Sequence, residues 1–308
     1  MKVLVLGAGA VGGYFGGRLA ERGVDVTFLV RERRRQQLAE RGLVVHSVNG
    51  DFRIQPQVIV AGEGVQPYDV ILLSTKAYHL ADAISPIANY VGEQTVIIPL
   101  LNGISHIGLL QETFGAERVL GGLCFIETTL NEAGDVVQTS QVHDLVYGEW
   151  AGGRTPRVEA LEKLFAGAAA GFRLSENIQQ EMWHKYLFIT TLSGMTTLMN
   201  AAVGPIREAA CGPELTRQLA DEVAQVMRAA GAPIADDIVD KQMQLFAKQG
   251  YGMKSSMLRD MEKGLPVEGE HLQGYLLKLA DAHGVDTPLL RIVYTNLKVY
   301  EIKRTEQQ

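Results

Sequence analysis

The first half of the chain alternates short apolar runs with stretches of helical character. The clearest runs are KVLVLG at 2–7, DVTFLV at 25–30, YDVILLSTKA at 68–77 and TVIIPLLNG at 95–103. They lack the polar and apolar alternation of a half-exposed strand, so we expect both faces of each strand to be covered. Strand and helix repeated in this way predict an α/β doubly wound sheet of parallel strands.

The pattern changes beyond residue 118. Further strand-like runs are RVLGGLCFIETTL at 118–130, DVVQTS at 135–140 and DLVYGEW at 144–150. Their spacing is closer than that of the strand–helix repeat before them. We interpret them as additional strands, some of them antiparallel, within the same layer as the parallel sheet.

Beyond about Gln179 the strand character ends, and apolar residues recur at intervals of three and four. This period predicts amphipathic helices. A chain of 308 residues is long for a single core. We therefore expect two domains, an α/β domain over residues 1–175 and an all-helical domain over residues 176–308.

A glycine-rich segment, GAGAVG at 7–12, directly follows the first apolar run and opens a helical pattern. This is the context in which G-x-G-x-x-G binds a dinucleotide in a Rossmann-type sheet. Gly7 would allow the tight turn, Gly9 the close approach of a pyrophosphate, and Gly12 the packing of the helix on the sheet. The helix N-terminus, with Ala10 and Val11, would favour the anionic phosphates. The alternative is a glycine-rich turn without a ligand.

Four arginines follow the second apolar strand, in VTFLVRERRR. In dinucleotide-binding folds an acid about 20 residues beyond the loop binds the 2′-hydroxyl of NAD. Here the residue 19 positions after Gly12 is Arg31. A guanidinium suits a 2′-phosphate through charge-assisted hydrogen bonds, which predicts NADP(H) as the cofactor. For Arg33, Arg34 and Arg35 two interpretations stay open: contact with the cofactor, and a solvated helix surface.

Composition narrows the class of protein. The net charge of −6 argues against general nucleic-acid binding, and no apolar run approaches the ~18 residues of a membrane span. Only two cysteines occur, Cys124 and Cys211, which provide no disulfide framework and no metal-ligand spacing. We expect a cytoplasmic protein with a small-molecule substrate and no metal, nucleic-acid or membrane partner.

Two polar residues follow apolar strands at positions where ligands are usually bound. Lys76 ends YDVILLSTKA, and Asn102 follows TVIIPLL. The carboxyl ends of parallel strands are where open α/β sheets bind ligands. Lys76 could contact the cofactor ribose or the substrate, and Asn102 the nicotinamide ribose or the reacting carbonyl. A surface lysine at a helix start and an ordinary Asn-Gly turn are the alternatives.

The helical half contributes Lys185, in the apolar-rich run EMWHKYLFITT. Burying a lysine is costly unless the charge has a task, although the side chain could also extend outward to solvent. Farther along, KSSMLRDMEKGLPVEGEH offers further polar groups, namely Ser255, Ser256, Asp260, Glu268 and Glu270. Serines before a helical run are typical N-caps, and the same helix start could bind a carboxylate.

Together these motifs resemble the ketopantoate reductase family, whose helical domain is like that of 6-phosphogluconate dehydrogenase. The resemblance rests on GAGAVGGYFGGRL, Arg31, STKA, LNG, EMWHKYLF, SSMLRD and EGEHLQGYLLKLADAHGVDTP, in family order along nearly the whole chain. It implies reduction of ketopantoate to D-pantoate by NADPH, a step toward pantothenate and coenzyme A.

The resemblance also implies roles for individual residues. Lys185 would be the catalytic lysine and Glu268 its acidic partner. Lys76 and Asn102 would lie at the cofactor and substrate, and Ser256 would bind the substrate carboxylate. Hydride transfer to a ketone leaves negative charge on oxygen, which a nearby ammonium can stabilise and protonate.

Three positions depart from the family pattern. Asparagines one and two turns after the catalytic lysine would contact the substrate, with position 193 on the same helix face as Lys185. These positions are Ile189 and Ser193, and a third family asparagine falls on Met253. Of the three, Ser193 keeps a polar group and is expected to bind the substrate together with Asn102 and Ser256. The pocket should therefore be more apolar, and a less hydroxylated 2-oxo acid becomes an alternative substrate.

The motifs leave the activity and the assembly of the protein open in three respects. A non-catalytic NADP(H)-sensing protein would keep the cofactor site and lose the chemistry. A different dehydrogenase of the same superfamily would share the fold. The helical half could also form a homodimer, although nothing in the residues requires it.

Overall fold

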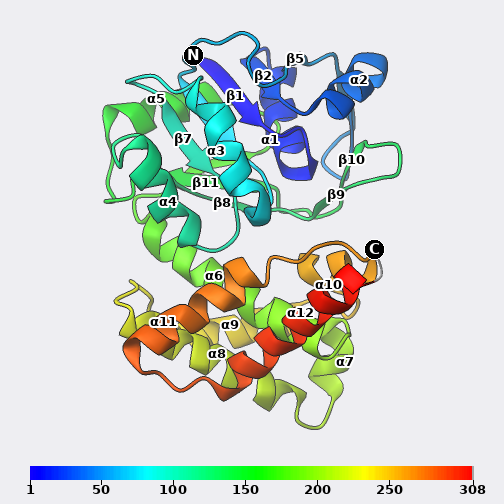
Figure 1. Cartoon of the computed structure of the whole chain (residues 1–308), viewed down its shortest axis with the longest axis vertical. Helices are drawn as coiled ribbons and strands as arrows, with labels where there is room; N and C mark the ends of the chain where they lie inside the picture. The colour runs from blue at the N-terminus through cyan, green and yellow to red at the C-terminus, as the bar shows by residue number, and fades with distance from the viewer. Residues whose placement is uncertain (307–308) are drawn as a thin grey trace. The chain divides into compact units, whose positions relative to one another are not determined.

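The computed structural model describes residues 1–306 and contains two compact units (Figure 1). Unit 1 comprises Met1–Leu101 and His106–Gln179. Unit 2 comprises Asn102–Ser105 and the chain from Gln180 onward. The loop Asn102–Ser105 therefore groups with the helical part of the chain, although it follows a strand of unit 1.

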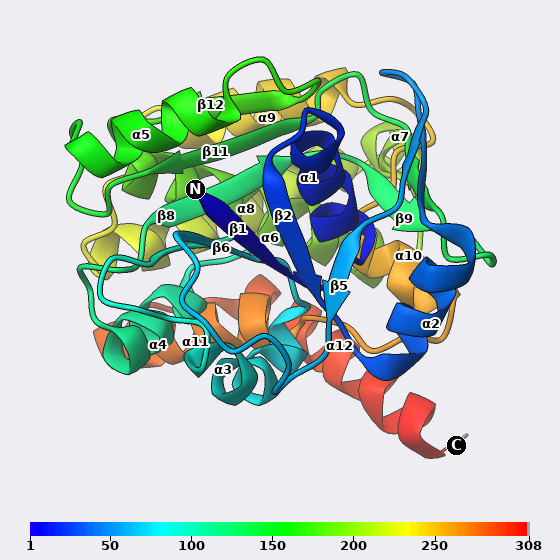
Figure 2. The same cartoon turned by 90° about the horizontal axis from the view of Figure 1, so that it is seen from above.

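Unit 1 is built on a five-stranded parallel sheet with the order β5-β2-β1-β6-β7. Figure 2 shows β1, β2 and β5 side by side. The strands are β1 (Lys2–Leu6), β2 (Asp25–Leu29), β5 (Gln57–Ile59), β6 (Val70–Leu73) and β7 (Val96–Pro99). In the register, Val5 lies opposite Phe28 on one side and Leu72 on the other. All three are completely buried, which confirms the parallel α/β prediction.

The helices of this unit follow the strands along the chain. They are α1 (Ala10–Glu21), α2 (Glu32–Arg41), the short 3₁₀ helix η1 (Ala77–His79), α3 (Leu80–Ala88), α4 (Ser105–Phe114) and α5 (Pro156–Phe165). Helix α1 packs unusually close to the sheet. A Cβ on Gly16 would lie 2.8 Å from Val5 Cγ2 and 2.9 Å from Phe28 Cε1, so only glycine permits this separation.

Two smaller sheets complete unit 1, and here the sequence-based interpretation was wrong. One has the order β4-β3-β10-β9 and the other β12-β11-β8. Their strands are β3 (Leu43–Ser47), β4 (Phe52–Ile54), β8 (Gly121–Phe125), β9 (Thr128–Leu130), β10 (Val136–Gln138), β11 (Asp144–Gly148) and β12 (Gly171–Leu174). The strands after residue 118 thus belong to separate sheets rather than to the main layer, although the antiparallel pairs β8–β11 and β9–β10 are as expected.

A proline explains why the main sheet ends at β7. The Ile97 N–H donates to Arg118 O at 2.8 Å and the Leu120 N–H donates to Ile97 O at 3.0 Å, as a sixth parallel strand would require. The next donor on β7 toward that side would be residue 99, which is Pro99 and has no N–H. The pairing therefore stops after one bridge, between Ile97 and Val119.

All regular secondary structure in the described part of unit 2 is helical, as predicted. Its helices are α6 (Ile178–Leu198), α7 (Val203–Glu208), α8 (Gly212–Ala229), α9 (Ile238–Lys248), α10 (Ser256–Glu262), the π-helix η2 (Glu270–Gly274), α11 (Tyr275–His283) and α12 (Pro288–Glu306). Helix α6 starts at the end of unit 1. Fully buried core residues include Val223, Leu276 and Val293. In residues 1–306, no helix combines the length and hydropathy needed to cross a bilayer.

The close packing at Gly12 generates a stability prediction. A Cβ on Gly12 would overlap the Gly7 carbonyl oxygen and Ser74 Oγ. Gly12→Ala should therefore destabilise the fold by about 1–3 kcal/mol, which lowers the midpoint of thermal unfolding by roughly 2–4 °C per kcal/mol. Gly9→Ala is the matched control, because nothing lies within 4 Å of its Cβ direction. Circular dichroism melts measure both, and an equal effect of the two substitutions would contradict the packing argument.

Candidate functional site

The glycine-rich loop turns sharply between β1 and α1. Gly7 has φ +92°, a conformation that favours glycine, and its N–H donates to Leu29 O at 3.0 Å. Gly12 lies where no side chain would fit. These two glycines therefore have the roles in turn and packing that the sequence motif predicts.

The carbonyl oxygens of this loop are all bound by donors, from neighbouring segments or from the first turn of α1. Ser74 Oγ donates to Leu6 O at 2.9 Å and lies 3.3 Å from Gly7 O, Arg34 Nε donates to Ala8 O at 3.0 Å, and the Gly13 N–H donates to Gly9 O at 2.8 Å. The loop therefore has no uncommitted carbonyl to face an anion.

Three N–H groups at the end of the loop, unlike its carbonyls, have no hydrogen-bond partner in the described chain. They belong to Gly9, Ala10 and Val11. Gly9 is the N-cap of α1 but has no side chain to cap it, and no acid occupies the first turn. The start of α1 thus combines unsatisfied N–H donors with the positive end of the helix dipole, which fits a dinucleotide pyrophosphate.

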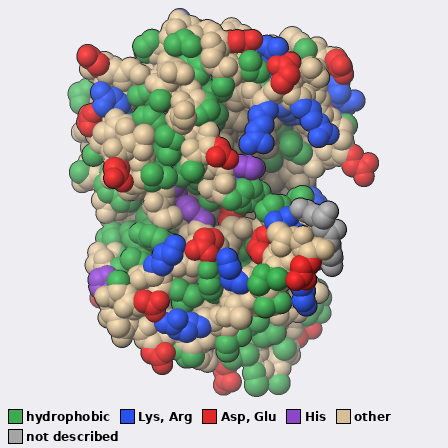
Figure 3. All heavy atoms as spheres, viewed as in Figure 1, with side chains coloured by type: hydrophobic (Ala, Val, Ile, Leu, Met, Phe, Trp, Pro, Cys, Tyr) green, Lys and Arg blue, Asp and Glu red, His purple; other side chains and the backbone are tan. Residues whose placement is uncertain are grey.

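The arginines after β2 divide into two groups. On the face in Figure 3, Lys and Arg side chains gather where Figure 1 places α2. Arg34 is partly buried against the glycine loop, and Arg35 pairs with Glu32 and with Glu63 at 2.8 Å. Arg31 is the N-cap of α2, two residues after the end of β2. Arg31 and Arg33 are exposed, and neither forms an ion pair or side-chain hydrogen bond within the described residues.

Lys76 and Asn102 follow neighbouring strands but belong to different units. Lys76 comes three residues after β6, is partly buried and is the N-cap of η1. Asn102 comes three residues after β7 and lies in the loop that belongs to unit 2.

Within unit 2 the structure joins two predicted site residues. Lys185 Nζ donates to Asn102 Oδ1 at 3.1 Å. Lys185 lies on α6, is partly buried, and has the buried Tyr186 beside it in the sequence. The amide thus holds the ammonium at a defined position.

A histidine that the sequence reasoning did not single out fixes the same loop. His271 Nε2 lies 2.7 Å from Asn102 O, and His271 Nδ1 lies 2.9 Å from Ser105 Oγ. Since a carbonyl only accepts, Nε2 carries the proton and Nδ1 accepts from the Ser105 hydroxyl. Burial lowers the pKa of His271, while the hydrogen bond to Asn102 and the charge of Glu268 act in the opposite direction. The neutral ring therefore anchors loop Asn102–Ser105 to η2.

The two predicted serines differ in their surroundings. Ser193 is buried, and its Oγ accepts a hydrogen bond from Gln273 Nε2 at 2.9 Å. Ser256 is exposed as the first residue of α10. Its neighbour Ser255 is the N-cap, because its Oγ accepts from the Leu258 N–H at 3.1 Å. Ser256 is thus left at the helix start without the capping role.

The remaining candidate positions lie in unit 2 as well. Glu268 is partly buried, and its backbone carbonyl accepts from the Leu272 N–H in η2 at 3.0 Å. Ile189 is partly buried one turn after Lys185 on α6. Met253 is partly buried just before α10.

The sequence reasoning missed His271 and Ser105, and it left Arg34 undecided. The only available signal for His271 was its place in EGEH, three residues after the singled-out Glu268 and one after Glu270. No spacing rule connects His271 with Ser105, which is 166 residues away in the chain. Such pairs become visible only when the chain is folded.

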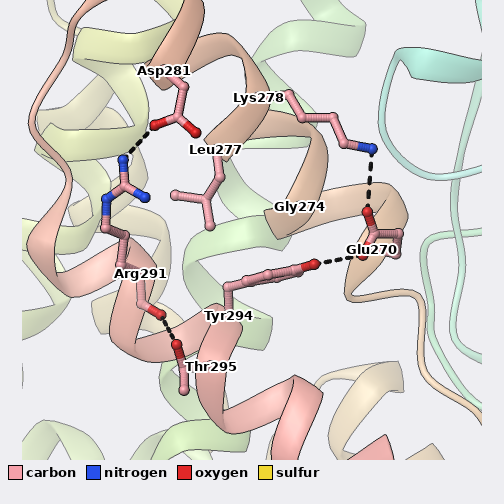
Figure 4. Close-up of a pocket in the computed structure, with 8 residues that line it drawn as sticks. All are labelled: Glu270, Gly274, Leu277, Lys278, Asp281, Arg291, Tyr294 and Thr295. Carbon is pink, nitrogen blue, oxygen red and sulfur yellow. Dashed lines mark hydrogen bonds and ion pairs between the residues drawn. The ribbon is translucent and has the colours of Figure 1, made fainter.

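A pocket of about 350 Å³ lies in unit 2 between η2, α11 and α12 (Figure 4). Leu277 lies between two ion pairs, Lys278 with Glu270 and Arg291 with Asp281. Tyr294 donates to Glu270 at 2.6 Å. Of the polar residues singled out from the sequence, only Glu270 lines this pocket, and none of the residues expected to bind cofactor or substrate does.

Comparisons with known proteins agree along the whole chain. The family model described as ketopantoate reductase PanE/ApbA matches residues 3–152, and the model of its C-terminal part matches residues 177–301. The uncharacterized oxidoreductase YkpB of Bacillus subtilis (strain 168) is 44% identical, covering 99% of this chain and 100% of its own.

Solved structures extend the comparison to the fold. The 2-dehydropantoate 2-reductase of Geobacter metallireducens GS-15 is 30% identical with a TM-score of 0.88, over 97% of this chain and 99% of its own. A D-mandelate dehydrogenase solved with NADH and anilino(oxo)acetate is 21% identical with a TM-score of 0.88, over 99% of each chain. At that identity the second likeness shows the fold alone.

The lowered pKa of His271 predicts a pH dependence of stability. Below a pH of about 6.5 the unfolded histidine binds a proton that the folded, buried ring resists. The midpoint of thermal unfolding should therefore fall as the pH is lowered from 7 to 5. His271→Gln keeps a donor and an acceptor but does not titrate, so its midpoint should fall less. An identical pH profile for both proteins would contradict the assignment.

Proposed function

Because the chain belongs to the ketopantoate reductase family of NAD(P)-dependent oxidoreductases, we propose that it reduces a 2-oxo acid with NADPH. Ketopantoate is the first candidate substrate, and D-pantoate would be its product. The protein would then act in the cytoplasm in pantothenate and coenzyme A biosynthesis. The activity proposed here does not depend on whether the protein forms a homodimer.

The hydrogen bond between Lys185 Nζ and Asn102 Oδ1, 3.1 Å long, is the observation that carries this proposal. When bound, the nicotinamide supplies a hydride to the carbonyl carbon, which leaves negative charge on the substrate oxygen. Lys185 stabilises that charge and gives the oxygen its proton, as a general acid. Asn102 orients the ammonium, and His271 fixes Asn102 in turn through its backbone carbonyl.

In this proposal, residues of unit 1 bind the cofactor. The N–H groups at the start of α1, from Gly9, Ala10 and Val11, bind the pyrophosphate. Arg31, exposed at the start of α2, pairs with the 2′-phosphate and sets the preference for NADP(H). Lys76 lies beyond β6 and contacts the ribose or the substrate. The glycines Gly7 and Gly12 shape the loop.

In this proposal, residues of unit 2 bind the substrate. Residues 1–175 then bind mainly the cofactor, and residues 176–308 bind mainly the substrate. Ser256, exposed at the start of α10, binds the substrate carboxylate. Glu268 is the acidic partner in the site, and its charge acts on His271.

A less hydroxylated 2-oxo acid is the second candidate substrate. The Ser193 hydroxyl already accepts a hydrogen bond from the buried Gln273, and Ile189 and Met253 add only apolar groups. Each of these positions offers less to a substrate hydroxyl than an asparagine would. The non-catalytic sensor remains the third candidate.

The first experiment compares substrates. NADPH oxidation is followed by absorbance with ketopantoate and with a panel of 2-oxo acids that differ in side-chain hydroxyl groups. We expect turnover, and the largest kcat/KM identifies the substrate. If NADPH binds but no 2-oxo acid is reduced, the reductase proposal is wrong and the sensor is favoured.

Removal of the proposed acid tests the mechanism. Lys185→Ala should lower kcat by at least about 100-fold, because general acid catalysis is typically worth 10²–10⁴ in rate. The Kd of NADPH should change little. Lys241→Ala, on an exposed lysine of α9 paired with Asp237, is the control and should keep the unaltered kcat. An unimpaired Lys185→Ala enzyme would eliminate this role.

Arg31 tests cofactor choice. A hydrogen bond between charged groups is worth roughly 1.5–3 kcal/mol, so Arg31→Ala should raise the KM of NADPH by about 10-fold to 100-fold. The KM of NADH should stay nearly constant. Steady-state kinetics with both cofactors measure this, and an equal loss for both would show that Arg31 does not bind the 2′-phosphate.

A further inference from the structure

Arg34 connects the glycine loop to a distant turn. Its Nε donates to Ala8 O at 3.0 Å, and its Nη1 donates to Gly134 O at 2.8 Å and to Gln37 Oε1 at 2.6 Å. The guanidinium is partly buried, in contrast to the exposed Arg31. One side chain of α2 thus joins the β1–α1 loop to the turn between β9 and β10.

The turn between β9 and β10 is shaped to receive this side chain. Gly134 has φ +80°, and a Cβ there would lie 2.8 Å from Arg34 Nη1 and overlap the Gln37 amide. Gln37 Nε2 also donates to the neighbouring Ala133 O at 2.7 Å. Both α2 side chains therefore bind backbone carbonyls of the same turn, which holds the guanidinium in one place.

The bond to Ala8 O determines where the next N–H points. In a trans peptide the C=O of one residue and the N–H of the next point in opposite directions. With the Ala8 carbonyl turned toward Arg34, the Gly9 N–H points away from it. Gly9 is also the first of the three N–H groups without an acceptor in the described chain. If this peptide rotated, a carbonyl oxygen would face the bound phosphates and repel them.

We propose that Arg34 is a positioning residue for the dinucleotide, which orients the Ala8–Gly9 peptide so that the loop N–H groups meet the pyrophosphate. This inference rests on the proposed binding of NAD(P)H by the glycine loop. The pyrophosphate is common to NADPH and NADH, so Arg34 supports both equally. Arg31, by contrast, is proposed to recognise only the 2′-phosphate.

The test measures Kd for NADPH and NADH by fluorescence titration, with thermal melts of the protein without cofactor. Arg34→Ala should raise both Kd values by the same factor, about 10-fold. Arg34→Lys keeps the charge but not the planar fork that reaches two carbonyls, so its Kd values should be intermediate. Arg35→Ala is the matched control, since Arg35 pairs with Glu32 and Glu63 on the surface.

Gly134→Ala provides a second variant that leaves Arg34 itself in place. It displaces the guanidinium from its turn, and both Kd values should again rise together. If Arg34→Ala fails to fold, the Kd values of Gly134→Ala test whether the position of the guanidinium controls dinucleotide binding.

Two results would overturn the inference alone. A loss confined to NADPH would make Arg34 a direct ligand of the 2′-phosphate. Unchanged Kd values with a lowered melting midpoint would make it a purely structural residue. If the unaltered protein binds neither dinucleotide, the proposed function fails as well, so the two failures are distinguishable.

Discussion

The close approach of α1 to the parallel sheet is the constraint from which the geometry of unit 1 follows. Gly12 and Gly16 face the sheet without side chains, and a Cβ at either would collide with a strand or with the loop that follows β1. Because the helix lies so near, the chain must turn within a few residues after β1. The turn directs its carbonyls to donors of the fold and leaves the N–H groups of Gly9, Ala10 and Val11 without acceptors in the described chain. Close packing thus produces a helix start whose unsatisfied N–H donors suit the pyrophosphate of the proposed cofactor.

The arginines after β2 differ in whether the fold provides them with partners. Arg34 and Arg35 are held by partners within the protein, on backbone carbonyls in one case and on carboxylates in the other. Arg31 and Arg33 stay exposed at the start of α2. Two exposed arginines therefore lie beside the end of β2 in a chain whose net charge is −6. Under the proposed function, this local charge attracts the 2′-phosphate of the cofactor although the net charge of the chain is negative.

In unit 2 a single asparagine is bound at both its backbone and its side chain. The Asn102 carbonyl accepts from the neutral ring of His271, and its Oδ1 accepts from Lys185. A group held on both sides has little freedom to reorient, so the ammonium it contacts is also confined. In the proposed mechanism, this confinement lets Lys185 meet the developing charge as general acid without first rearranging.

Local pattern was enough to predict the parallel α/β sheet, the helical second half and the tight glycine turn between β1 and α1, because these depend on hydrophobic period and on glycines at fixed spacing. It could not predict that the strands after residue 118 form separate sheets, because their partners, such as β3 for β10, come from distant segments of the chain. Nor could it pair His271 with Ser105 or Arg34 with Gly134. Those contacts exist only in the folded chain, because packing in three dimensions brings together residues that lie far apart in sequence.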